Sequence, residues 1–375
     1  MGTITRSIAN NIVTGGKLDG TDGLNGTIPA SNIADASLTN ITSLSPSLGS
    51  AITSVSVDPP APAEGQMWYN SSSGTLKGYQ LATVNSFSAG GNLNTGRLGL
   101  AGANSGTQTA TIIFGGNSGP GAAPAFLNST ESYNGTSWTT LPATMSTARN
   151  YLAGCGTQTS ALAFSGLTTT PAPSGVSVLS ESYNGTSWTN TPTMNTTGQQ
   201  RFGVGASNTS ALCFLGSGPA NANGLFHTES WNGSSWTSVN NANNGRAGGG
   251  SAGVQGAALG FGGYRGGFGM QSSTESWNGT SWTSVNSLNT ARGGQGFGSQ
   301  TAAVMGGGYS TANTGATELW NGTAWTNNPT GLSTGRSSAA GIGSQTLGLI
   351  VGGGSGSTDT EEWTGIALQT KTVTV

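Results

Sequence analysis

The sequence predicts an all-β fold made of six copies of a four-stranded unit. A block that ends in Trp recurs along the chain, an Arg recurs in step with it, and a short apolar run ending in glycine follows each Arg. No apolar pattern keeps the 3.6-residue period of a helix. Four antiparallel strands in a repeat of about 40 to 50 residues are typical of a β-propeller, so we expect a six-bladed β-propeller.

The Trp block is the most regular part of each repeat. It reads ESYNGTSW at 131–138 and 181–188, ESWNGSSW at 229–236, ESWNGTSW at 275–282 and ELWNGTAW at 318–325, and a shortened copy, EEWTG, begins at Glu361. Asn-Gly is a strong hairpin signal, because a two-residue type I′ turn needs a positive φ at both positions. Each block therefore predicts the third and fourth strands of a unit, joined by a two-residue turn. We expect its closing Trp to lie in the core between blades, in preference to forming a stacking platform for a ligand.

The first two strands of each unit follow a repeated Arg. The apolar runs after it read IIFGG, LAFSG, LCFLG, LGFGG, AVMGG and LIVGG. In an antiparallel meander the starts of the first and third strands lie at the same end, so each Arg is expected to reach the Glu of a Trp block. Because every repeat carries both, we favour structural ion pairs over a ring of carboxylates for a ligand. The residues are Arg97, Arg149, Arg201, Arg246, Arg292 and Arg336, with Glu131, Glu181, Glu229, Glu275, Glu318 and Glu361.

A Gly-Gly pair after the second strand, an aromatic residue on the third and a Trp on the fourth resemble the Kelch family, whose members are β-propellers. The resemblance covers residues 97 to about 363. Ser165-Gly166 and Leu215-Gly216 depart from the doublet, and the sixth copy lacks its second Trp. The segment LATVNS at 81–86 is similar in sequence to the fourth-strand segment WTSVNS at 282–287. This makes the segment before the repeats a candidate for completing the last blade.

The chain before the repeats differs in composition. Residues 1–65 contain no aromatic residue and too little apolar volume for a core, so we expect an extended N-terminal attachment arm. Residues 66–96 are expected to form a linker and a hairpin, and 97–375 the propeller. Two segments, LDGTDGLNGTIPASNIADASLTNIT in the arm and PAPAEGQMWYNSSSGTLKGYQ at 60–80, resemble N-terminal parts of bacteriophage tail and other virion structural proteins. That resemblance implies a place on the virion, in the tail or another exterior structure, as a homo-oligomer joined to other virion proteins by the arm.

Composition argues against several classes of function. Charged residues make up 6 % of the chain and the net charge is −2, which disfavours nucleic acid as a partner. Two cysteines and one histidine give no metal motif, so we expect no metal and no cofactor. No apolar run approaches the roughly 18 residues of a membrane span. Beyond residue 64 only Asp359 and Glu362 lie outside the repeated acids, and among the repeats only Arg265 outside the repeated arginines, so we expect no enzyme activity.

The connections between the second and third strands vary most in length and sequence, and variable loops on a rigid scaffold commonly carry binding. The candidate binding residues on this loop face are Phe126, Phe226, His227, Tyr264, Arg265, Phe268 and Tyr309. The sequence therefore suggests a virion structural protein, such as a tail fibre or spike, that displays the propeller to a host-surface glycan or protein or to another virion protein. A purely structural adaptor or capsid decoration protein is the first alternative. A carbohydrate-active propeller enzyme is the second.

Overall fold

The computed structural model describes residues 53–62, 66–119, 125–168, 175–219 and 224–373, and in these residues it contains strands and no helix. This part of the chain accordingly has no helix able to cross a bilayer. The chain divides into two compact units, one formed by Met1–Val84 with Ile366–Val375 and the other by Asn85–Gly365. The unit that contains the repeats thus runs from Asn85 to Gly365, whereas the sequence predicts the propeller over 97–375 with residues 66–96 leading into it. Most of the predicted arm, residues 1–52 and 63–65, lies outside the described residues.

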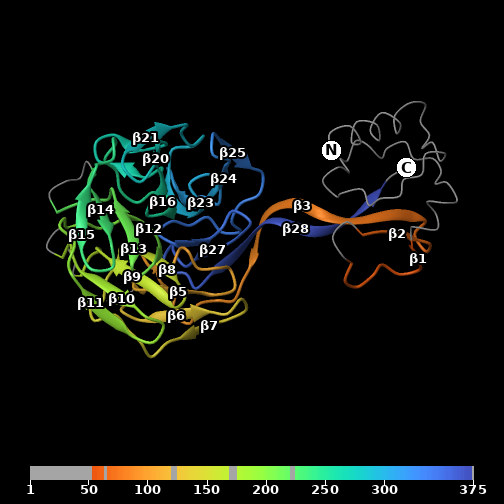
Figure 1. Ribbon diagram of the computed structural model, residues 1–375, viewed down its shortest axis with the longest axis horizontal. Helices are drawn as coiled ribbons and strands as arrows, with labels where there is room; N and C mark the ends of the chain where they lie inside the picture. Colours follow the sequence, from red (N-terminus) through yellow and green to blue (C-terminus); the bar gives the residue numbers. More distant parts are fainter. Residues whose placement is uncertain (1–52, 63–65, 120–124, 169–174, 220–223, 374–375) are drawn as a thin grey trace. The chain divides into compact units, whose positions relative to one another are not determined.

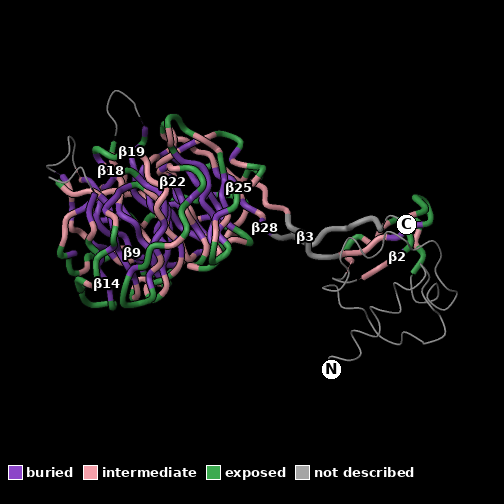
Figure 2. The backbone as a smooth tube through the Cα atoms, turned by 90° about the horizontal axis from the view of Figure 1, so that it is seen from above, coloured by how far each residue is buried: buried purple, intermediate pink, exposed green. Residues whose placement is uncertain are grey.

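The unit Asn85–Gly365 has a propeller-like all-β architecture. Figure 1 shows its four-stranded antiparallel sheets side by side around a common centre, and Figure 2 shows buried residues throughout it. Each of five sheets follows one repeat in chain order. They are formed by β4 (Ala101–Gly102), β5 (Thr111–Phe114), β6 (Thr130–Tyr133) and β7 (Trp138–Thr140); by β8 (Ala153–Thr157), β9 (Ser160–Phe164), β10 (Ser180–Tyr183) and β11 (Trp188–Thr191); by β12 (Phe202–Ser207), β13 (Ser210–Phe214), β14 (Thr228–Trp231) and β15 (Trp236–Val239); by β16 (Gly250–Val254), β17 (Ala257–Phe261), β20 (Thr274–Trp277) and β21 (Trp282–Val285); and by β22 (Gly293–Gly298), β23 (Ala303–Tyr309), β24 (Thr317–Trp320) and β25 (Trp325–Asn328).

The last repeat is completed by a strand from before the repeats. Its sheet has the order β1-β2-β3-β28-β27-β26, with β26 (Ala340–Gly343), β27 (Leu347–Val351), β28 (Thr360–Val373) and β3 (Thr75–Ala89). Thr364 stands where the other repeats have the turn-forming Asn, so the third strand does not fold back and runs on as β28. The final residues of β3 thus occupy the fourth-strand position next to the start of β28.

The hairpin of the Trp block differs from the predicted two-residue turn. Tyr133 pairs with Trp138, which leaves four residues in the loop. Only Gly135 has a positive φ, at 91°. The side-chain oxygen of Asn134 accepts hydrogen bonds from the backbone N–H groups of Thr136 and Ser137, both at 2.9 Å. The type I′ prediction is therefore wrong, because the Asn side chain closes the loop and needs no positive φ.

The first strands of successive sheets contact one another in a closed series, in which β4, β8, β12, β16, β22 and β26 each meet the next and β26 meets β4. The closing Trp of each block connects its sheet to the outer part of the neighbouring sheet. Trp188 Nε1 donates to Thr130 Oγ1 of the preceding sheet at 2.9 Å, and Trp138 Nε1 donates to Thr360 Oγ1 at the same distance. The second bond joins the first repeat to the last. Four of the five closing tryptophans are buried and Trp188 is half-buried, as a role in the core between sheets requires.

A second set of links between sheets was missed in the sequence. The turn between the first and second strands carries a Gln or Asn in every repeat, and its side-chain amide donates to a third-strand carbonyl of the preceding sheet. Gln158 donates to Tyr133 O at 2.9 Å, and Gln108 donates to Trp363 O at 2.9 Å across the junction of the last and first repeats. The other members are Asn208, Gln255, Gln300 and Gln345. Their regular recurrence after the glycine-rich strand was the available signal.

The hairpin predicted within 66–96 is present in the unit that contains residues 53–84. β2 (Met67–Asn70) pairs with β3 across a turn of three serines and Gly74, and β1 (Thr53–Val55) pairs with β2 in parallel. Trp68 is fully buried, and its Nε1 donates to Asp58 Oδ1 at 2.9 Å. Asn70 Nδ2 donates to the same oxygen at 2.7 Å, and Lys77 Nζ lies 2.6 Å from Asp58 Oδ2. One carboxylate therefore ties the loop before the hairpin to both of its strands.

This carboxylate gives the hairpin a defined response to acid. The hydrogen bonds from Lys77, Asn70 and Trp68 lower the pKa of Asp58 to about 2. A depressed pKa means that the ionised form stabilises the fold above the ordinary pKa of a carboxyl, about 3.9, and that this contribution is lost as the pH falls through about 2. In an NMR titration we expect the Asp58 carboxyl carbon and the Trp68 indole N–H to shift together with a midpoint near 2. The Asp58→Asn variant should remove that transition, and a midpoint near 4 in the parent chain would contradict the network.

Candidate functional site

Five of the six repeated Arg–Glu pairs are formed, each within one repeat. Arg97 Nη2 lies 2.6 Å from Glu131 Oε1, Arg149 Nη2 lies 2.9 Å from Glu181 Oε1, and Arg246 Nη1 lies 2.6 Å from Glu275 Oε1. Arg292 pairs with Glu318 and Arg336 with Glu361 in the same way. All ten side chains are buried. These carboxylates are therefore engaged internally and do not form an open ring for a ligand.

Each pair is also bonded to the backbone around it. Arg97 Nη1 donates to Gly115 O at 3.1 Å and to Ser129 O at 3.2 Å, and Glu131 accepts from the backbone N–H groups of Asn94 and Thr95. Burial lowers the pKa of Arg97, and the nearby Glu131 carboxylate opposes that shift. The Arg97 guanidinium links the residue after β5 to the residue before β6 in its own sheet, which is a structural role.

The sixth predicted pair, Arg201 with Glu229, does not form. Arg201 Nη1 donates to Thr196 O at 3.3 Å and Nη2 donates to His227 O at 3.2 Å. Gly198 holds the backbone position that Arg occupies in the other repeats, and a Cβ there would lie 2.5 Å from Arg201 Cδ. The Arg201 side chain thus reaches back into the space left by Gly198. Comparing MNTTG at 194–198 with LNTGR at 93–97 was the signal in the sequence.

The two acids that lie outside the repeats beyond residue 64 have different surroundings. Tyr133 Oη donates to Glu362 Oε1 at 2.6 Å, and burial together with this hydrogen bond raises the pKa of Tyr133 to about 12. Glu362 therefore belongs to the junction between the last and first repeats. Asp359 is half-buried in the loop before β28. Across the described ranges no three His, Cys, Asp or Glu side chains gather in a way that could hold a metal ion.

The predicted loop residues fall into two groups. Tyr264 and Arg265 form β18, which pairs with β19 (Gly269–Met270), and Phe268 at the tip of this hairpin is 67 % exposed. The Arg265 guanidinium lies 4.3 Å from the centre of the Phe268 ring. Tyr309, at the end of β23, is exposed as well. The other group is less available for binding: Phe126 and Phe226 are half-buried, and His227 is exposed but uses its carbonyl to hold Arg201.

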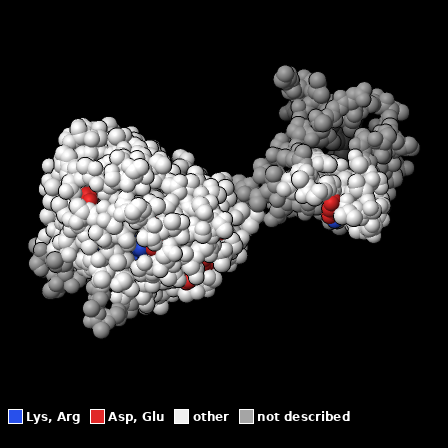
Figure 3. Space-filling view, turned by 90° about the horizontal axis from the view of Figure 1, so that it is seen from below, with Lys and Arg blue, Asp and Glu red and all other residues white. Residues whose placement is uncertain are grey.

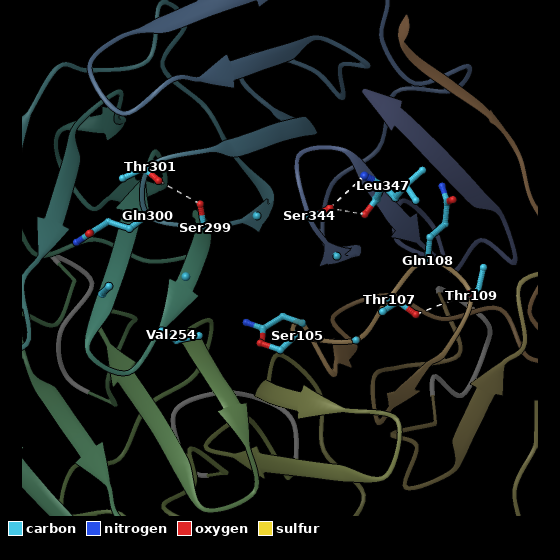
Figure 4. A pocket seen from close by; sticks show the side chains of 16 residues that line it. Ser105, Thr107, Gln108, Thr109, Val254, Ser299, Gln300, Thr301, Ser344 and Leu347 are labelled. Atoms are coloured by element: carbon cyan, nitrogen blue, oxygen red, sulfur yellow. Dashed lines mark hydrogen bonds between the residues drawn. The ribbon is translucent and has the colours of Figure 1, made fainter. Parts of the chain in front are cut away.

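Two cavities lie at opposite ends of the first strands. At the end that carries the β18–β19 hairpin, a cavity of about 330 Å³ is lined by Tyr151, Gln200, Tyr264 and Tyr309 among others; we call it the tyrosine cup. Figure 4 shows the cavity at the other end, about 600 Å³, formed by the turns between first and second strands, with Ser105, Thr107, Ser299 and Thr301 in its uncharged wall. In the lining of this larger cavity, Asn104 Nδ2 donates to Gly203 O at 2.8 Å and Ser105 Oγ to Gly205 O at 2.9 Å. Residues 104 and 105 thus link the first repeat to β12 of the third.

A ring of backbone hydrogen bonds surrounds the tyrosine cup; we call it the collar. Tyr151 N donates to Gly99 O, Gln200 N to Tyr151 O, Gly248 N to Gln200 O, Gly294 N to Gly248 O, and Gly99 N to Ser338 O, at 2.7 to 3.1 Å. The side-chain amide of Gln295, in the orientation that satisfies its surroundings, accepts from Ser338 N at 2.9 Å and completes the ring. Sequence reasoning missed the collar, because five of its members (Gly99, Tyr151, Gln200, Gly248 and Ser338) share a positive φ and not a residue type.

The chemistry of the tyrosine cup is aromatic and uncharged. Arg201 is the one charged residue in its lining, and its guanidinium donates hydrogen bonds to two backbone carbonyls. Figure 3 shows that charge is sparse on the visible face of the molecule. The cup therefore suits a ligand that is bound by ring contacts and neutral hydrogen bonds.

Comparison with known proteins bears on the fold alone. No known family model matches the chain, and no curated protein sequence matches it. Among solved structures, one titled "Structure of YjhT" has a TM-score of 0.59 and 14 % sequence identity, and the match covers 75 % of this chain and all of that one. The likeness supports the propeller-like all-β architecture and carries no information on ligand or activity at this identity.

Proposed function

We propose that this chain is a bacteriophage virion structural protein, in which a six-bladed Kelch-like propeller is displayed for binding and the segment before it attaches to other virion proteins. The observation that carries the proposal is the distribution of charge and aromatic side chains. Five buried ion pairs consume ten of the charged residues, while Tyr264, Phe268 and Tyr309 stand exposed at the loop face.

A scaffold of this kind favours recognition by shape. Few surface charges mean little long-range steering of a partner, so affinity has to come from contacts made after encounter. Exposed aromatic side chains supply large contact area with little entropy to lose, and they are enriched where proteins bind partners. The same distribution supports a non-enzymatic role, since five of the six repeated carboxylates are held in ion pairs and Glu362 accepts a hydrogen bond from Tyr133.

The proposed location of the protein on the virion exterior is tested on intact virus particles. Antibodies raised against the full chain, detected with gold labels by electron microscopy, should mark an exterior structure of the virion. A chain that lacks residues 1–65 should fail to enter particles, whereas the full chain enters them. Normal incorporation of the shortened chain would contradict attachment through the arm, and absence of label from particles would contradict the proposed class.

Binding through the loop face is tested with a paired substitution. Particles that carry Tyr264→Ala with Phe268→Ala should adsorb to host cells at least tenfold more slowly than the parent. The matched control is Val254→Ala, an exposed apolar side chain at the opposite end of the strands. Unchanged adsorption of the paired variant, with normal incorporation, would favour the alternative of a structural adaptor or decoration protein.

A further inference from the structure

Three side chains at the tyrosine cup occupy backbone positions that favour glycine. Tyr151, Gln200 and Ser338 have φ values of 50°, 49° and 56°, and the equivalent collar positions in two other repeats are Gly99 and Gly248, with φ of 61° and 65°. A residue with a side chain is strained in this left-handed region, because its Cβ comes too close to the backbone carbonyl. Tyr151, Gln200 and Ser338 take part in the collar through their backbone groups, so the collar does not require their side chains.

The strained side chains form part of the wall of the cup. The Tyr151 ring reaches over the neighbouring collar position, with Cδ1 3.0 Å from where a Cβ on Gly99 would lie. The Gln200 side chain extends toward Gly248 in the same way, with Cδ 4.0 Å from the corresponding point. Together with Tyr264 and Tyr309 they line a single concave space. Three of the six non-glycine residues with positive φ in the described part of the chain thus line one cavity, and strained backbone commonly serves binding.

The polar groups of these residues are free. Within the described chain, the Gln200 amide and the hydroxyls of Tyr151, Tyr264 and Tyr309 make no hydrogen bond to another protein group, whereas the Gln295 amide beside them is held by Gly306 O and Ser338 N. An amide offers both a donor and an acceptor, and each phenol offers one of each. The cup therefore combines several aromatic faces with neutral groups that can both donate and accept.

We propose that the tyrosine cup binds one uncharged sugar unit of a saccharide, with Tyr151 and Gln200 as its principal contacts. This rests on the proposed function, because it names the chemical class recognised at the displayed face. A sugar ring has an apolar face of C–H groups that packs on aromatic rings, and a rim of hydroxyls that both donate and accept. A volume of about 330 Å³ lies at the small end of ligand pockets, which suits a terminal unit better than a long chain.

Charge favours a neutral sugar over an acidic one. Arg201, the charged residue in the lining, already donates to Thr196 O and His227 O, and its Nε is enclosed without access to a ligand. Arg265 lies outside the lining and stacks on Phe268. A carboxylate placed in the cup would lose hydration while the one cation in the lining is engaged by two carbonyls, which is costly.

The test uses the full chain on an array of immobilised oligosaccharides that end in glucose, galactose, N-acetylglucosamine or an acidic sugar, followed by calorimetry with the best neutral probe. Tyr151→Gly and Gln200→Gly should each weaken binding at least tenfold while the unfolding temperature stays equal or rises, because each removes backbone strain. A purely structural role for these side chains would instead lower the unfolding temperature.

The matched control is Ser165→Gly. Ser165 has a φ of 58°, Gly115 holds the same position in the first repeat, and the residue lies outside the cup. It should gain stability in the same way and bind like the parent. Tyr264→Ala, which leaves the collar intact, gives a second reading of the cup and should also weaken binding. Parent-like binding by the Tyr151 and Gln200 variants, binding of acidic sugars alone, or binding of peptides with no sugar bound would each overturn the proposal; label on the virion exterior would still support the proposed function.

Discussion

Replacing Arg246 by alanine is expected to lower the free energy of unfolding by about 3 to 5 kcal/mol. The guanidinium is fully buried and donates to Glu275 Oε1, to Gly260 O and to Gly262 O. Its removal leaves a buried carboxylate without its cation and takes the guanidinium donor from three carbonyls, those of Asn244, Gly260 and Gly262. Urea unfolding of the full chain measures the loss. If the slope of the unfolding free energy against urea concentration is unchanged, the substitution has changed the stability and not the surface exposed on unfolding.

Two comparisons separate the ion pair from the rest of the contacts. The double variant Arg246→Ala with Glu275→Gln should recover part of the loss, because the uncompensated charge is gone. Arg201→Ala should cost less than Arg246→Ala, since Arg201 forms no ion pair and Glu229 is already held by Asn195 and Thr196. Equal losses for the two arginines would mean that packing, and not charge, accounts for the effect.

The unpaired Glu229 shows why the repeat pattern predicts the ion pairs as a set but not each individual pair. The repeated Arg and Glu and the apolar runs predicted the strands and six ion pairs, of which five form, because each repeat has to meet the same packing requirement. Arg201 satisfied that pattern by residue type while standing three positions after Gly198, the true equivalent of the other arginines. Spacing from the preceding Trp carries this information: Trp188 to Arg201 is longer than the matching interval in the other repeats.

The candidate site was predictable only in part. Tyr264 and Tyr309 stood out as aromatic residues in variable loops, and both line the tyrosine cup. Tyr151 and Gln200 did not, because their significance lies in a backbone conformation that no pattern of residue types encodes. The collar depends on hydrogen bonds between repeats about fifty residues apart, so its geometry appears only when the sheets are assembled.

Trp363→Ala is expected to destabilise the unit Asn85–Gly365 by about 3 to 5 kcal/mol, the usual range for deleting a buried large aromatic side chain. Trp363 is fully buried, its ring centre lies 4.9 Å from that of Phe87, and its carbonyl accepts from Gln108 Nε2. It therefore sits at the place where the last repeat meets both the first repeat and the strand that completes it. Urea unfolding of the full chain gives the size of the loss.

The matched variant is Trp277→Ala, at the same position of a repeat whose four strands are consecutive in the sequence. Both substitutions remove a buried Trp side chain. The strand next to Trp277 is tethered by a short hairpin, whereas the end of β3 is held beside β28 by packing and hydrogen bonds such as Gly90 N to Thr360 O at 2.8 Å. Hydrogen exchange of the Gly90 and Leu93 amides should accelerate at least tenfold more in Trp363→Ala than in Trp277→Ala. Equal acceleration in the two variants would mean that the junction is no weaker than any other contact between sheets, so that the absence of a covalent hairpin there costs the ring nothing.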